Sequence, residues 1–103
     1  MATRERRLHV DLQDGFEDEP VLVHVDGEPA YRNETVRTDY RISRAASFEQ
    51  AVTADTALVE VSLPRRGLSD SRQVDVSHTP YLGISILDGA IRWRHSPVPF
   101  GYM

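Results

Sequence analysis

Apolar residues alternate with other residues in several short runs of this chain, and this alternation limits the possible folds more than any other feature. The runs lie at residues 8–12, 21–25, 59–63, 74–76, 82–86 and 91–93. Successive side chains of a β-strand point to opposite faces, so each run has one face suited to a core. No stretch has a long helical period. The pattern therefore predicts an all-β protein.

Turn signals separate these runs. They are Asp-Gly at 14–15, 26–27 and 88–89, and Pro64 to Gly67. Short strands joined by such turns predict a single small antiparallel β-sandwich of about 7–8 strands, an architecture shared by Ig-like, transthyretin-like and C2-like domains. The whole chain, residues 1–103, suits one domain. We expect residues 1–6 to be a flexible start and residues 96–103 to be an extended, proline-containing C-terminal tail.

The last two runs specify a hairpin in the most detail. Asp88-Gly89 between them fits a type I′ turn, in which both central residues have positive φ angles. This turn pairs Ile84 with Trp93 and predicts an apolar face formed by Leu82, Ile84, Ile86, Ile91, Trp93 and the core-edge residue His95. The opposite face carries Gly83, Ser85, Arg92 and Arg94.

Two stretches alternate less clearly. A proline and a polar pattern over residues 29–37 predict an edge strand, because proline cannot donate the hydrogen bond that a central strand needs. Residues 43–54 permit two interpretations. Ser47 and Gln50 have the spacing of a capping box, which begins a helix, whereas residues 48–52 also alternate as in a strand. We favour the strand.

Composition argues against several classes of function. The absence of Cys excludes a disulfide framework, a thiolate metal site and a cysteine nucleophile. All 12 basic residues are Arg, but 16 acidic residues are interleaved with them and the net charge is -4, so we expect no nucleic-acid surface. No apolar run approaches ~18 residues, so we expect no membrane span. No apolar stretch follows the basic residues 1–7, and we expect a cytoplasmic location.

A repeated His-x-Asp pattern is the first candidate metal site. His9 and Asp11 lie in one alternating run, and His24 and Asp26 in another. If the two runs form a hairpin, the imidazoles face each other, with Cβ atoms ~5 Å apart. Imidazoles and carboxylates are suitable ligands for zinc or nickel. The plainer interpretation is a pair of solvated surface histidines.

The acidic loop at residues 14–19 is a second candidate metal site. Together with Asp11 it offers several carboxylates, and loops of this kind at one end of a sandwich can hold calcium. Its spacing does not match an EF-hand loop. Phe16 is expected to anchor the loop to the core. The plainer interpretation is a loop that aids solubility and protects a sheet edge.

A third candidate site would bind a protein partner. Arg92 and Arg94 stand beside small residues on the polar face of the last hairpin, which leaves room for a carboxylate, a phosphate or an acidic strand. Tyr81, Phe100 and Tyr102 add aromatic side chains, which together with arginine dominate binding hot spots. The tail is too apolar for a free end, so we expect it either to fold back over the core or to dock on a second subunit or a partner.

Catalytic motifs are absent from the sequence. There is no nucleophile elbow, no phosphate-binding glycine loop and no His-Glu-x-x-His pattern. We therefore expect no enzyme, although a small hydrolase that uses His78 or His95 remains a less favoured alternative. We expect no cofactor unless a divalent metal binds.

The sequence favours a non-catalytic β-sandwich module that binds a protein partner or itself. The alternative is a domain that binds a metal or a small ligand through His9 and His24 or through the acidic loop at residues 14–19. Architecture alone does not distinguish these functions.

Overall fold

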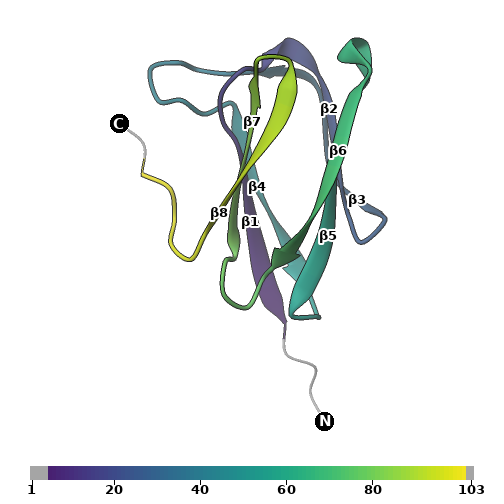
Figure 1. The fold of residues 1–103 in the computed structure, drawn as a ribbon, viewed down its shortest axis with the longest axis vertical. Coiled ribbons are helices and arrows are strands. Elements are labelled where there is room, and N and C mark those ends of the chain that lie inside the picture. Colours follow the sequence, from purple (N-terminus) through teal and green to yellow (C-terminus); the bar gives the residue numbers. More distant parts are fainter. Residues whose placement is uncertain (1–4, 102–103) are drawn as a thin grey trace.

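The computed structural model describes residues 5–101, which form a sandwich of two β-sheets with eight strands (Figure 1). Sheet A has the strand order β4-β1-β7-β8, and sheet B has the order β3-β2-β5-β6. The strands are β1 (Arg6–Leu12), β2 (Glu17–Val25), β3 (Glu28–Arg37), β4 (Ala46–Val52), β5 (Thr56–Leu63), β6 (Leu68–Asp75), β7 (Tyr81–Leu87) and β8 (Ala90–Ser96). A short 3-10 turn, η1 (Pro64–Arg66), joins β5 to β6. The predicted small β-sandwich is confirmed.

The core lies between the two sheets and uses alternate residues of each strand. In β5, for example, Val59, Val61 and Leu63 are fully buried while Glu60 is exposed. Phe16, from the connection between β1 and β2, is the largest of the fully buried side chains, as its predicted role as an anchor requires. Full burial of one such side chain contributes about 1.5–3 kcal/mol, so this layer is the main source of stability.

The last hairpin has the predicted register. Ile84 pairs with Trp93, and Ile86 pairs with Ile91. The turn residues Asp88 and Gly89 have φ angles of 53° and 73°, the positive values that a type I′ turn needs. Trp93 is half-buried, and His95 is exposed at the end of the strand rather than at the edge of the core.

The hairpin expected between residues 8–12 and residues 21–25 is not formed. These residues belong to β1 and β2, which lie in different sheets. The chain crosses between the sheets because β7 holds the connection: Gln13 N–H donates to Ile84 O at 2.8 Å, and Ile86 N–H donates to Asp14 O at 2.8 Å. β1 pairs with β7 in parallel, the one exception to the antiparallel pairing among the described strands.

The less regular stretches also have defined places. β3 is an edge strand of sheet B, as predicted. Residues 46–52 form strand β4, so the strand interpretation is correct. β1 begins at Arg6, whose guanidinium Nε donates to Asp55 Oδ1 at 3.0 Å, so the flexible start does not extend to this residue. Residues 1–4 lie outside the described part. No helix between residues 5 and 101 has the length and apolar character to cross a membrane.

Candidate functional site

The outer face of sheet A brings together the described residues that were predicted to bind a partner. β7 contributes Tyr81 and β8 contributes Arg92 and Arg94, all on the side away from the core. Cross-strand pairing places Arg94 beside Gly83, and Gly83 beside Asp11 of β1. Tyr102 lies outside the described residues.

The C-terminal segment folds back over this face instead of over the core. After β8 it reverses direction and runs alongside sheet A (Figure 1). The Ser96 hydroxyl donates to Val98 O at 2.6 Å, and Val98 N–H donates to the same hydroxyl oxygen at 3.2 Å. This turn brings the Phe100 ring to the Arg94 guanidinium, with 5.0 Å between the guanidinium carbon and the ring centroid. The contact is a cation–π interaction.

Gln13 is a site residue that the sequence did not reveal. A Cβ atom on Gly83 would lie 2.6 Å from Gln13 Oε1, so the glycine is what lets this amide lie flat on the sheet. Gln13 is nearly fully buried and lines a pocket together with Arg94 and Phe100. The alternation of β1 ends before position 13, so only the tertiary structure places this side chain.

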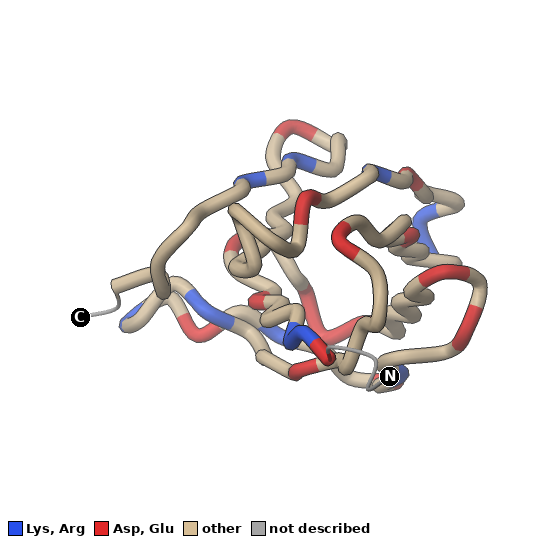
Figure 2. Tube along the Cα trace, turned by 90° about the horizontal axis from the view of Figure 1, so that it is seen from below, with Lys and Arg blue, Asp and Glu red and all other residues tan. Residues whose placement is uncertain are grey.

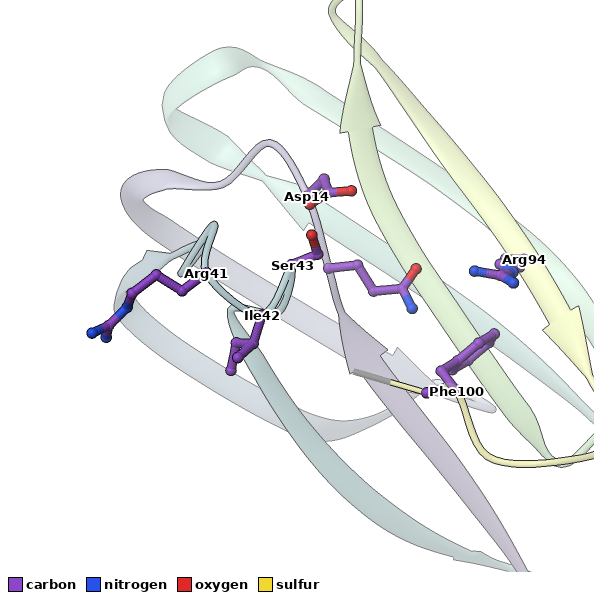
Figure 3. Close-up of a pocket in the computed structure, with 8 residues that line it drawn as sticks. Asp14, Arg41, Ile42, Ser43, Arg94 and Phe100 are labelled. Atoms are coloured by element: carbon purple, nitrogen blue, oxygen red, sulfur yellow. The ribbon is translucent and has the colours of Figure 1, made fainter. Parts of the chain in front are cut away.

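Two pockets flank the Phe100 ring. The first has a volume of about 310 Å³ and lies between β8 and the loop at residues 41–43, with Arg94 and Phe100 at one end and Ile42 at the other (Figure 3). The second has a volume of about 360 Å³, and its lining includes His9, Tyr81 and Glu49. Phe100 is a wall of both pockets, so its ring lies between them.

Arg92 and Arg94 are the cations available on this face. Within residues 5–101 neither guanidinium forms an ion pair. Of the two, only Arg94 contacts an aromatic ring. Arg41, at the far side of the first pocket, is instead held by Asp39 through contacts of 3.0 and 2.8 Å. The hydrogen bond from Arg41 is the largest cause that lowers the pKa of Asp39 to about 2.

The candidate zinc or nickel ligands are not brought together. His9 lies on sheet A, stacked on Tyr81 at 4.6 Å, with Nδ1 3.1 Å from Glu49 Oε1. His24 lies on sheet B, paired with residues 29 and 60. Asp26 accepts a hydrogen bond of 2.9 Å from Leu58 N–H. Residues 5–101 contain no group of three or more His, Asp and Glu side chains arranged to hold a metal ion.

The acidic loop is held by arginines from η1. Glu19 is fully buried, and its carboxylate oxygens accept from Arg66 at 2.7 and 2.5 Å. Arg66 also donates to Gly15 O, while Arg65 donates to the carbonyl oxygens of Glu17 and Asp18. A cation placed among these oxygens would meet two guanidinium groups. Elsewhere too, acidic and arginine positions are interspersed around the trace (Figure 2).

His78 belongs to a cluster with Asp75 and Ser77 that resembles a catalytic triad only in composition. Asp75 Oδ2 lies 2.9 Å from His78 Nδ1, and Ser77 Oγ lies 3.0 Å from the same nitrogen. A triad requires the acid and the nucleophile at opposite ring nitrogens. The hydrogen bonds from Ser77 and then His78 lower the pKa of Asp75 to about 2. Asp75 Oδ1 also accepts from the backbone N–H groups of Ser77 and His78, so the cluster stabilises the turn after β6.

No protein-family model, no curated protein and no solved structure matches the chain.

Proposed function

We propose that this domain is a non-catalytic interaction module that binds a protein partner through the outer face of sheet A. The observation that carries the proposal is the pair Arg92 and Arg94. Both are exposed, neither forms an ion pair within residues 5–101, and Arg94 lines the first pocket, where its guanidinium contacts the Phe100 ring. Arginine and aromatic residues around a depression are the usual composition of an interaction hot spot.

The shallow shape of this face favours an extended protein segment over a small molecule as its ligand. Both pockets are shallow, and the tail divides them rather than encloses them. Small-molecule sites enclose most of the ligand surface, which this face does not do. An extended segment that lies along the strands can instead fill both depressions and present a carboxylate to the arginines.

Charge reversal on this face tests the proposal. The immobilised domain is incubated with native extract, and captured proteins are quantified by mass spectrometry for the wild type and for Arg92→Glu/Arg94→Glu. We expect a specific captured protein whose recovery falls at least about tenfold in the variant, because each lost charge-assisted contact costs about 1.5–3 kcal/mol.

The matched control is Arg32→Glu/Arg37→Glu on β3, which makes the same change of net charge on sheet B. It should leave recovery of that protein unchanged. Equal losses for both double variants would show that net charge, and not this face, determines capture. Sedimentation velocity of the wild type at increasing concentration separates a partner from self-association.

A further inference from the structure

We propose that the C-terminal arm, residues 97–101, is an intramolecular occupant of the outer face of sheet A, and that the partner is an extended segment with an aromatic side chain that displaces it from Arg94. This inference rests on the proposed function of the face. It adds the chemistry of the partner segment and a contact that restrains its binding.

Among the described residues of the arm, 97–101, Phe100 makes the main contact with the face. Phe100 is half-buried and is a wall of both pockets, whereas Pro97, Val98 and Pro99 are exposed. Val98 remains 60% exposed although it is apolar. The hydrogen bonds of Val98 close the local turn with Ser96 and do not join the arm to the sheet. Within residues 97–101, a contact made mainly by one ring can open without disturbing the sandwich.

The arm also fills the face poorly. The residues beside the Phe100 ring are Pro99, toward the second pocket, and Gly101, toward the first. Among residues 97–101, these short side chains do not fill the pockets of about 310 and 360 Å³ on either side of the ring. A segment with an aromatic residue in place of Phe100 and larger neighbours gains contacts that the arm does not make. Such differential contact is what allows one occupant to replace another.

Charge defines a second feature of the partner segment. Arg92 and Arg94 project from the same face of β8, two residues apart. In an extended segment that lies along β8 with its aromatic residue at Arg94, residues two apart are separated by about 6.6 Å, so an acidic residue two positions toward Arg92 reaches that guanidinium. The pattern aromatic-x-acidic therefore matches this face. The arm itself has no acidic residue between positions 97 and 101.

A tethered occupant lowers the apparent affinity of a free one. The partner binds only the fraction of molecules in which Phe100 has left Arg94. Its apparent dissociation constant is therefore the intrinsic dissociation constant divided by that fraction, which is a higher value. Removing the anchor makes the face permanently available. Phe100→Ala should therefore tighten binding of a suitable segment, whereas Val98→Ala, a change at an exposed position of the same arm, should not.

The probe is a capped synthetic peptide with larger residues on both sides of its phenylalanine, acetyl-Pro-Val-Leu-Phe-Leu-Glu-amide, titrated into the full-length, isotope-labelled chain and followed by NMR chemical shifts. We expect it to bind Phe100→Ala about tenfold more tightly than the wild type or Val98→Ala, as removal of a predominantly closed arm requires. Shifts should centre on β7 and β8. A peptide with Ala in place of Phe, or the added change Arg94→Ala, should abolish binding.

Two results would overturn the inference. Equal affinity for the wild type and Phe100→Ala, or binding to neither, would show that the arm does not compete at this face. A wild-type dimer in sedimentation velocity that is lost in Phe100→Ala would assign the arm to a second copy. Neither result touches the proposed function, which depends on the response of partner capture to Arg92→Glu/Arg94→Glu.

Discussion

Glu19 is a fully buried carboxylate that remains charged because of its partners. Burial raises the pKa of Glu19, but the hydrogen bond from Arg66, the one from Glu17 N–H, and the charges of Arg66 and Arg65 outweigh it. The net pKa is below its ordinary value of 4.5. The pair fastens β2 to η1, two elements far apart in the sequence, and gives the acidic loop its shape.

Replacing this carboxylate should therefore be costly. We expect Glu19→Gln to lower the free energy of unfolding by about 2 kcal/mol, because the guanidinium of Arg66 loses charged hydrogen bonds and is only partly open to water. Glu17→Gln is the control. Its carboxylate is 3.8 Å from the same guanidinium, and its side chain is 76% exposed, so its loss should cost well under about 1 kcal/mol. Urea denaturation measures both.

The pH dependence gives a second check on Glu19. A carboxylate with a lowered folded-state pKa contributes stability above its unfolded-state pKa and loses it as pH falls through the folded-state value. The stabilities of the wild type and Glu19→Gln should therefore differ fully at neutral pH and converge as pH falls below 4.5 and through the lowered pKa of Glu19. A constant difference across this range would contradict a charged Glu19.

At the scale of elements, turn chemistry decides what a sequence can specify. Asp88-Gly89 links its strands through two residues, which fixes partner, register and exposed face together, so the grouping of Arg92 with Arg94 was predictable. The connection between β1 and β2 has no such constraint. Alternation identified both strands but contains no information about which sheet each one joins, so the expected approach of His9 to His24 was wrong.

The same limit applies within the candidate site. The contact of Phe100 with Arg94 and the position of Gln13 over Gly83 depend on how the chain returns after β8 and where β1 leaves its sheet. Neither the contact nor the position of Gln13 follows from the alternation of side chains within a strand. Glu19 had the same polar appearance as its acidic neighbours, and its burial follows from a β2 irregularity at Asp18, where φ is 56°.

Gly15 is where the β1–β2 connection meets β7 most closely. A Cβ atom there would lie 1.9 Å from Ile86 O, a backbone atom that cannot move without disturbing the hydrogen bond to Asp14. We expect Gly15→Ala to destabilise the domain by at least about 3 kcal/mol, through this overlap and the positive φ. Thermal melting with circular dichroism measures the change.

Gly27 distinguishes the effect of the steric overlap from that of the positive φ angle. Its φ of 81° resembles the 89° of Gly15, but nothing lies within 4 Å of the Cβ position. Gly27→Ala should therefore cost only the backbone term, about 1–2 kcal/mol. Similar losses for the two variants would mean that the connection is free to move away from β7.

At the scale of the whole molecule, an edge of one sheet is joined to an edge of the other by a side-chain bridge. The Trp93 indole N–H on β8 donates to Asp70 Oδ2 on β6 at 2.9 Å, and the Arg72 guanidinium lies 5.7 Å from the Trp93 ring centroid. The hydrogen bond from Trp93 is the largest cause that lowers the pKa of Asp70. Together with the shared core, this bridge couples the two sheets.

We expect the sheets to unfold together. Trp93 is the only tryptophan of the chain, so its fluorescence reports on the bridge while far-ultraviolet circular dichroism reports on all strands. The two signals should share one urea midpoint, the mark of a two-state transition. Asp70→Ala should lower that midpoint in both signals by an equivalent of about 1 kcal/mol, the net value of one side-chain hydrogen bond.

Glu34→Ala is the control, because it removes an exposed pair with Arg32 on edge strand β3 and should leave both midpoints in place. If fluorescence instead changes before circular dichroism in the wild type, the bridge opens while the sheets persist, and the core alone holds them together.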